Sequence, residues 1–240
     1  ILAQGEILDI AVSPDGRRVA VLEAGEAIAA DPDHVRAHGM RRRSRLKLVD
    51  AETGAITASP TTDVALHLLR WSGRSDAVLV WARADGEAWR EGGLRRIDIS
   101  GVETSFDQGG LSALIEGGDV DELRGVQADW LAEVPVLRAR KAGGQRFDWY
   151  ALVAGRAPRA LTAALETPPD RLAAVMDGSL LMFADGALWK AELEAGLTRL
   201  SPPDVRLADG GHIDGMQALR LRIAQARVEE EPSALEEQPA

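Results

Sequence analysis

Short apolar segments that alternate with polar residues and end at a glycine recur along the chain. Four of them share this pattern: Leu46 to Gly54, Leu94 to Gly101, Phe147 to Gly155 and Leu188 to Gly196. Their glycines are separated by 47, 54 and 41 residues. A period of about 40 to 55 residues, with several short strands in each unit, is typical of β-propeller blades. The pattern predicts an all-β fold, a β-propeller-like array of four to five blades of short antiparallel strands that forms an incomplete part of a larger propeller.

The clearest hairpin comes first. Ile7 to Val12 and Arg18 to Leu22 flank the turn Ser13-Pro14-Asp15-Gly16, in which proline presets φ, aspartate bonds the backbone and glycine accepts positive φ. Residues 24–44 have no clean period and are expected to be an insertion. Residues 109–124 are expected to be a loop or short helix, and 130–140 one strand.

These elements predict one propeller domain over residues 1–228 and an acidic disordered tail over 229–240. The blades are expected at roughly 5–57, 64–105, 126–162 and 170–202, with a partial one at 203–228. Within that last segment Leu219, Leu221 and Ile223 alternate with arginines as in a strand. Met216, Leu219 and Ile223 also fit one face of a helix, so both interpretations stay open.

Composition narrows the range of functions. The formal net charge is −10, and the one dense basic cluster is local, which argues against nucleic acid as a partner. The apolar runs are far shorter than the roughly 18 residues of a membrane span. Cysteine is absent, which excludes disulfides, thiolate catalysis and zinc sites of the cysteine type. No cofactor is expected, and the localisation, cytoplasmic or periplasmic, is open.

Catalytic signatures are missing from this sequence. A nucleophile elbow needs glycine two residues before and two after its serine, and no serine here has both. The four histidines form no recognisable triad pattern. We therefore expect no catalytic residue in this chain, and whether the full-length protein is an enzyme stays open.

Arginines around the predicted insertion are the candidate binding residues: Arg36, Arg41, Arg42, Arg43 and Arg45. Guanidinium groups suit carboxylate or phosphate ligands, so an anion or a substrate carboxylate is the functional hypothesis. The alternative is an exposed insert that balances an acidic protein.

Two further sets of residues have competing interpretations. His34 and His38 have the spacing of two ligands on one helical face but lack the glutamate of the zincin motif, so a solvated insertion is favoured over a metal site. The six tryptophans fall mostly in predicted strands, which favours packing between blades over a platform for ligands.

The segment Ile10-Ala-Val-Ser-Pro-Asp-Gly-Arg-Arg-Val-Ala20 resembles a blade hairpin of the propellers in prolyl-oligopeptidase-type serine peptidases, including dipeptidyl and acylaminoacyl peptidases. The endings Pro158 to Thr162 and Thr198 to Pro202 are similar to strand closures of the same propellers. A bacterial subgroup that opens lasso peptides by isopeptide hydrolysis has comparable propellers. The Ser-Pro-Asp-Gly hairpin also occurs in the Tol-system propeller and other protein-binding propellers.

The resemblance implies a non-catalytic propeller region that gates the access of peptide substrates to a C-terminal α/β-hydrolase domain not present in this chain. Four or five units are fewer than such enzymes usually have, so no catalytic residue is carried over. An open arc of blades also needs a partner domain or another protein subunit on its end faces. The alternative is a standalone interaction propeller, Tol-system-like or WD-repeat-like, with 24–45 and 107–124 as contact surfaces. A metal- or phosphate-dependent enzyme is the third hypothesis.

Overall fold

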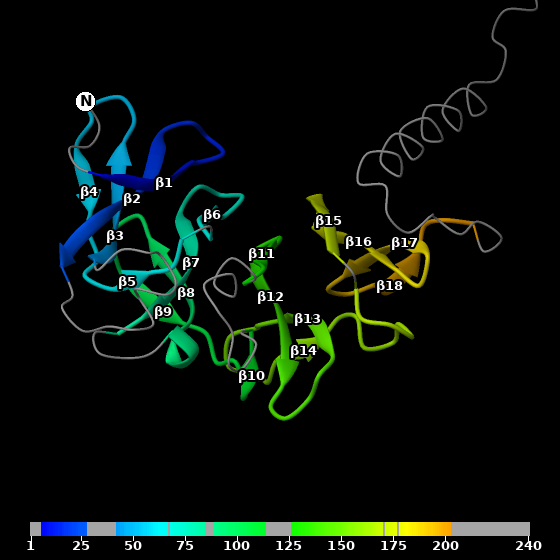
Figure 1. Cartoon of the computed structure of the whole chain (residues 1–240). Helices are drawn as coiled ribbons and strands as arrows, with labels where there is room; N and C mark the ends of the chain where they lie inside the picture. The colour runs from blue at the N-terminus through cyan, green and yellow to red at the C-terminus, as the bar shows by residue number, and fades with distance from the viewer. Residues whose placement is uncertain are drawn as a thin grey trace, which may run out of the picture.

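The described residues form four antiparallel sheets, which succeed one another along an arc in the computed structural model (Figure 1). The structure describes residues 6–27, 42–66, 68–84, 89–113, 126–169, 171–176 and 178–202. We name the sheets 1 to 4 in chain order. Sheet 1 lies at one end of the arc and sheet 4 at the other.

Sheets 1 and 4 are simple meanders in which each strand pairs with the next. The strands of sheet 1 are β1 (Ile7–Val12), β2 (Arg18–Ala27), β3 (Arg42–Asp50) and β4 (Ile56–Ala58). The strands of sheet 4 are β15 (Arg171–Met176), β16 (Ser179–Ala184), β17 (Ala187–Glu192) and β18 (Gly196–Arg199). Both sheets therefore have the plan of a propeller blade, with four short strands joined by tight turns.

Sheets 2 and 3 differ from this plan because the first strand of each is split in two. In sheet 2, β5 (Asp63–Val64) and β6 (Arg70–Trp71) pair with β7 (Ala77–Arg83), followed by η1 (Trp89–Glu91), β8 (Gly93–Asp98) and β9 (Glu103–Ser105). In sheet 3, β10 (Leu111–Ser112) and β11 (Ala128–Leu131) pair with β12 (Val134–Lys141), followed by β13 (Phe147–Ala151) and β14 (Arg159–Ala160).

Apolar faces of neighbouring sheets make the core. Ala20, Leu22 and Leu46 of sheet 1 pack with Val78 and Val80 of sheet 2. A second cluster joins sheet 2 to sheet 3, and a third joins sheet 3 to sheet 4. Because side chains alternate across a strand, each middle sheet contributes one set of residues to the junction before it and the other set to the junction after it.

The first strands of the sheets lie along one side of the arc, with β6 and β11 standing for the split first strands of sheets 2 and 3. We call these four strands the inner strands. β1 lies against β6, β6 against β11 and β11 against β15. Two tryptophans bond across these contacts: Trp71 Nε1 donates to the carbonyl of Ala11 at 3.0 Å, and Trp130 Nε1 donates to the carbonyl of Arg70 at 2.9 Å. For these two residues the predicted packing role between blades is confirmed.

The sequence prediction differs from the structure in three segments. β2 continues to Ala27 and β3 begins at Arg42, so the expected insertion 24–44 is shorter than predicted. The expected strand 130–140 is two strands, because the backbone turns at Ala132 with φ 54°. A short strand, β10, lies in the region expected to be a loop or helix. The predicted partial blade 203–228 and the tail lie outside the described residues.

Candidate binding surfaces

Of the predicted anion-binding arginines, two have described side chains. Arg36 and Arg41 lie outside the described residues, and Arg42 begins β3 without a described side chain. Arg43 and Arg45 lie on β3. The structure therefore places the described part of this predicted cluster on a strand of sheet 1, beside the segment that leads to sheet 2.

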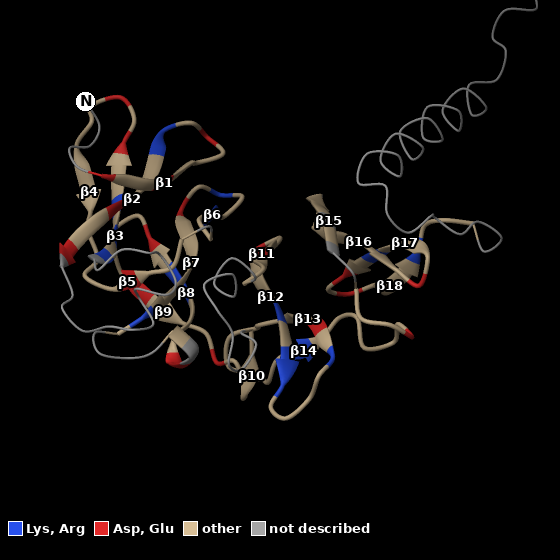
Figure 2. Cartoon of the chain, viewed as in Figure 1, with Lys and Arg blue, Asp and Glu red and all other residues tan. Residues whose placement is uncertain are grey.

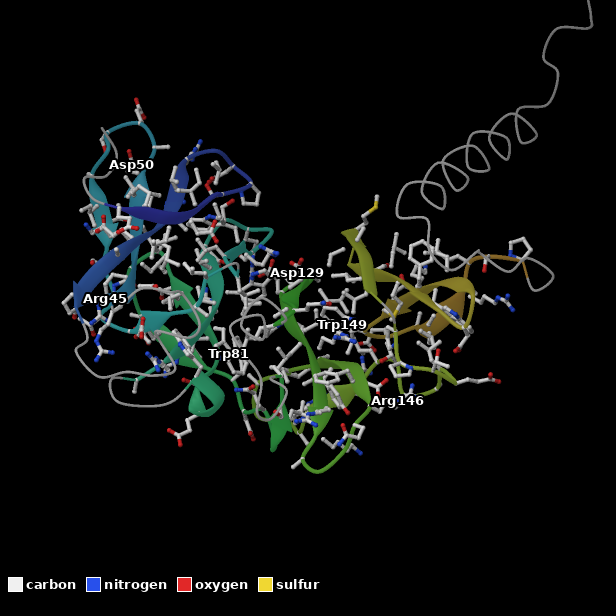
Figure 3. The ribbon with its side chains drawn as sticks, in the orientation of Figure 1. Arg45, Asp50, Trp81, Asp129, Arg146 and Trp149 are labelled. Atoms are coloured by element: carbon white, nitrogen blue, oxygen red, sulfur yellow. The ribbon has the colours of Figure 1, made fainter. Side chains whose placement is uncertain are left out.

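Arg45 is bonded within the protein on two sides. Its Nε donates to Glu26 Oε2 at 3.0 Å, its Nη2 bonds the other carboxylate oxygen, and its Nη1 donates to the carbonyl of Thr61. These bonds tie β2 and β3 to the connection between sheets 1 and 2 (Figure 3 labels Arg45). The hydrogen bonds from Arg45 lower the pKa of Glu26 to about 2.

A buried ion pair lies next to Arg43. Asp63, at the start of β5, accepts hydrogen bonds from Arg83 Nε at 3.0 Å and from the amide of Ser44 at 2.9 Å. Arg43 Nη1 lies 3.8 Å from the same carboxylate, and the Arg83 guanidinium stacks 4.2 Å above the Trp89 ring. Asp63 and Arg83 are both buried. Arg43 and Arg45 on β3 thus contact the junction of sheets 1 and 2.

Sequence reasoning missed Asp63 and Arg83. They are 20 residues apart and become neighbours because β5 and β7 pair at Asp63 and Arg83. An aspartate at the start of one strand and an arginine at the end of the next but one was a weak signal, since both also suit an exposed turn. Asp63 and Arg83 can be buried as charged groups because hydrogen bonds satisfy them.

Arg146 bonds the connection between sheets 3 and 4 as Arg45 bonds the connection between sheets 1 and 2, and we call both of them arginine clamps. Arg146 Nε donates to Asp148 at 2.9 Å, and Arg146 Nη2 donates to the carbonyl of Leu165 at 2.9 Å (Figure 3). Asp148 also accepts a bond from the Thr162 hydroxyl at 2.8 Å, and that hydroxyl accepts one from the amide of Trp149. Arginine clamps of this kind hold the connections after sheet 1 and after sheet 3.

The inner strands carry a different pair of charges. Arg70 on β6 and Asp129 on β11 approach to 3.8 Å between Nε and Oδ2, and both side chains are partly exposed. Burial raises the pKa of Asp129, although Arg70 and a bond from the amide of Trp130 oppose that rise. The Asp129 carboxylate is therefore easier to protonate than an aspartate in water.

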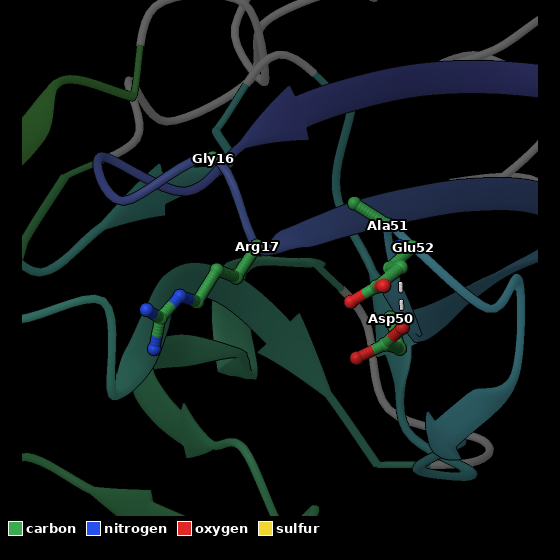
Figure 4. Close-up of a pocket in the computed structure, with 5 residues that line it drawn as sticks. All are labelled: Gly16, Arg17, Asp50, Ala51 and Glu52. Carbon is green, nitrogen blue, oxygen red and sulfur yellow. Dashed lines mark hydrogen bonds between the residues drawn. The ribbon is translucent and has the colours of Figure 1, made fainter.

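One shallow pocket of about 500 Å³ lies at an end of sheet 1 and is lined by Gly16, Arg17, Asp50, Ala51 and Glu52 (Figure 4). Asp50 Oδ1 accepts bonds from the amide and hydroxyl of Thr53, and the Thr53 hydroxyl lowers the pKa of Asp50. The Asp50 carboxylate is therefore engaged within its own turn, and Arg17 and Glu52 are the other charged residues that line the pocket.

Exposed apolar side chains gather on one face of sheet 1. The register pairs Ile10 with Val21, Val12 with Val19, and Val49 with Ile56, and directly opposed residues share a face. Ile10 and Val12 on β1 are each 60% exposed and Ile56 on β4 is 53% exposed, whereas Val19, Val21 and Val49 on the two strands between them are buried. We call this set, Ile10, Val12, Val19, Val21, Val49 and Ile56, the outer face of sheet 1. Clustered exposed apolar residues are typical of interaction surfaces.

Other features add little to the choice of site. Lys, Arg, Asp and Glu are interspersed over all four sheets (Figure 2). Among the residues that the structure describes, no group of three acidic, histidine or cysteine side chains is placed to hold a metal ion. His34 and His38 lie outside that part of the chain. Within the described ranges no helix has the length and apolar character needed to cross a bilayer.

Comparisons with known proteins agree with this architecture. No family model matches the chain, and no curated protein matches it. Among solved structures, the acylaminoacyl peptidase of Pyrococcus horikoshii matches 83% of this chain and 32% of its own, with 12% identity and a TM-score of 0.51. A structure from a study of two prolyl endopeptidases matches 83% of this chain and 29% of its own, with 17% identity and a TM-score of 0.49.

TolB from Acinetobacter baumannii matches 85% of this chain and 46% of its own, with 15% identity and a TM-score of 0.47. The chain thus spans less than half the length of each of these three proteins. Identities this low show the fold and nothing beyond it. The four sheets and the acylaminoacyl peptidase match confirm the predicted fold, an all-β array of propeller blades that resembles a peptidase propeller.

Proposed function

We propose that this chain is the propeller region of a prolyl-oligopeptidase-like serine peptidase, and that it restricts which peptides reach a hydrolase domain outside these 240 residues. The observation that carries the proposal is the fold shared with acylaminoacyl peptidase over 83% of the chain. The sequence of the Ser13-Pro14-Asp15-Gly16 hairpin supports it independently.

The inner strands suit a passage better than a docking groove. A propeller encloses a central channel, and an extended peptide binds a sheet edge through free backbone groups. On β1 the amide of Ile10 donates to Asp9 Oδ1 at 2.8 Å, and on β11 the amide of Trp130 donates to Asp129 Oδ1 at 2.8 Å. Amides bonded in this way are not offered to an incoming strand. A channel wall of this kind filters peptides by size without holding them.

The test is the intact mass of the protein from its native source, together with labelling by a fluorophosphonate that reacts with activated serines. Because the chain spans 32% of the acylaminoacyl peptidase, we expect roughly two to three times 25.7 kDa in one polypeptide. We also expect labelling that prior phenylmethylsulfonyl fluoride prevents. A native mass near 25.7 kDa without labelling contradicts the proposal.

A second candidate is an interaction propeller that binds another protein. Ile10, Val12 and Ile56, the exposed residues of the outer face of sheet 1, favour it because apolar patches on a surface are typical of protein contacts. Segments 24–45 and 107–124 are further candidate contact surfaces. A native mass near 25.7 kDa supports this candidate. A protein that co-purifies with the unmodified chain but not with a Val12→Asp variant supports it as well.

A further inference from the structure

The turn after each inner strand contains a residue with left-handed backbone, and we call these four turns the inner turns. In chain order the residues and their φ values are Gly16 (70°), Ser75 (60°), Ala132 (54°) and Gly178 (72°). Glycine adopts this conformation freely, whereas a residue with a Cβ adopts it at an energetic cost. The inner turns of sheets 2 and 3 therefore hold a strained residue where glycine would fit better.

The first two inner turns are equivalent residue by residue. In each of them a serine amide bonds the carbonyl that starts the following strand: Ser13 to Arg18, and Ser72 to Ala77, both at 2.9 Å. This equivalence aligns Gly16 with Ser75. It also aligns three pairs of buried apolar residues in the two sheets: Val19 with Val78, Val21 with Val80, and Val49 with Ile97.

Ser75 bonds the inner turn of the neighbouring sheet. Its hydroxyl accepts a hydrogen bond from the amide of Asp15 at 3.1 Å, and its carbonyl accepts one from Arg18 Nη1 at 3.4 Å. Ser75 is only 3% exposed, so these bonds are largely shielded from water. At Gly16, the equivalent position, a Cβ would meet no atom within 4 Å. The strained residue with a hydroxyl therefore stands where a neighbouring turn lies within its reach.

A third bond crosses the same boundary beside the inner turns. Trp71 Nε1 donates to the carbonyl of Ala11 at 3.0 Å. At the boundary of sheets 2 and 3 Trp130 makes the corresponding bond, but Ala132 in that inner turn is exposed and carries no hydroxyl. The two boundaries thus share the indole bond and differ at the strained residue.

We propose that Ser75 is a latch between sheets 1 and 2, and that the contacts of β1 with β6 open together when its bond to Asp15 breaks. A strained backbone persists only where its surroundings fix it, and such residues are typical of conformational devices. The latch holds β1 beside β6 and so fixes part of the inner side of the arc. This inference goes beyond the proposed function and does not rest on it.

The first test is hydrogen exchange of the Asp15 amide, followed by NMR on the 240-residue chain. Ser75→Gly removes the hydroxyl and relieves the backbone, whereas Ser75→Ala removes the hydroxyl and keeps the strain. In both variants the Asp15 amide should exchange roughly ten-fold faster or more, because its bond to the hydroxyl is lost. Ala132→Gly is the matched control, since it relieves the next inner turn without removing a hydroxyl. It should leave the exchange of Asp15 unchanged.

The same variants separate the latch from a purely local role in the turn. Ala132→Gly should raise the midpoint of urea unfolding, because glycine fits left-handed backbone better. Ser75→Gly gains the same relief but loses the bond to Asp15, so it should raise the midpoint less than Ala132→Gly or lower it. Ser75→Ala, which gains no relief, should lower the midpoint.

The indole N–H of Trp71 reports whether the boundary opens as a unit. It bonds sheet 1 at Ala11 and does not touch the Ser75 hydroxyl through any bond of its own. A latch at Ser75 should therefore speed its exchange in Ser75→Gly and Ser75→Ala by about the factor seen for Asp15. The indole N–H of Trp130, at the next boundary, should keep its exchange rate. In the unmodified chain, rising urea should accelerate the exchange of Asp15 and of the Trp71 indole in parallel.

Three outcomes overturn the proposal. The Asp15 amide could exchange in Ser75→Gly as it does in the unmodified chain, or Ser75→Gly could raise the urea midpoint as much as Ala132→Gly does. The Trp71 indole could also keep its exchange rate in both Ser75 variants, which would show that each bond of the boundary opens by itself. Should either Ser75 variant fail to fold, the parallel response of Asp15 and Trp71 to urea in the unmodified chain decides.

Discussion

Sheets 1 and 2 carry equivalent apolar faces that meet different surroundings. Val78, Val80 and Ile97 of sheet 2 are buried against sheet 1. On sheet 1 the corresponding Val19, Val21 and Val49 are buried too, but Ile10, Val12 and Ile56 on the edge strands of the same face are largely exposed. The repeat of the strand pattern determines which residue types occupy a face, but only the neighbouring sheet determines how much stability they contribute. Substitutions at equivalent or neighbouring positions of the two sheets should therefore have very different effects.

The largest effect is expected at the buried ion pair of the junction. Asp63→Ala leaves Arg83 buried without its carboxylate and removes the acceptor of the Ser44 amide. Loss of one partner of a buried pair costs about 3–5 kcal/mol, which should appear as a lower midpoint of urea unfolding. Glu26→Ala is the comparison at an exposed pair with Arg45, where about 1 kcal/mol or less is expected. Equal losses in the two variants would show that burial does not separate the two pairs.

The next effect compares two isoleucines. Ile97→Ala opens a cavity between sheets 1 and 2 and should lower the free energy of unfolding by about 2–5 kcal/mol. Ile56→Ala, on the outer face, should change it by about 0.5 kcal/mol or less. Both are measured by urea unfolding. A large loss for Ile56→Ala would mean that its side chain is covered within the folded protein.

Alternation and turn residues predicted the repeated units because side chains alternate between the two faces of a strand and many of the turns contain glycine or aspartate. They did not predict the turn at Ala132, because alanine rarely adopts left-handed backbone. Its φ is nevertheless 54°. The Asp63–Arg83 pair was also missed, because it depends on the register of β5 against β7. The strand around Leu46 was predicted from its alternation, but Arg43 was assigned to the insertion 24–44, and only the pairing with β2 shows that the strand begins at Arg42.

A smaller effect is expected from the indole bonds between inner strands. Trp71→Phe removes the bond to the carbonyl of Ala11 and should cost about 0.5–1.5 kcal/mol in unfolding free energy. Trp130→Phe should cost a similar amount at the next junction. Val12 occupies the position equivalent to Trp71, because the next residues, Ser13 and Ser72, make the same bond to the start of the second strand. Val12→Phe therefore serves as the variant without a bond to lose. If all three variants unfold alike, the indole bonds do not stabilise the junctions.

The smallest effect distinguishes two carboxylates that both face an arginine. Glu26 has its pKa lowered to about 2 by Arg45, so its contribution to stability is present above the unfolded pKa and is lost as the pH falls from about 5 toward 2. Burial raises the pKa of Asp129, and the bond from the Trp130 amide and Arg70, 3.8 Å away, offset that rise only in part. Its carboxylate is therefore protonated more easily in the folded than in the unfolded chain, and stability is lost as the pH rises through the raised pKa.

Glu26→Gln should accordingly be less stable than the unmodified chain at pH 7, and this difference should disappear toward pH 2. Asp129→Asn keeps an oxygen for the amide of Trp130 but has no charge to bury. It should be slightly more stable than the unmodified chain at pH 7, with the difference closing as the pH falls below about 4. Urea midpoints at pH 7, 5 and 3 measure both series. If the two differences change in the same direction with pH, the site of Asp129 and Arg70 between sheets 2 and 3 is as well hydrated as the exposed pair of Glu26 and Arg45 on sheet 1.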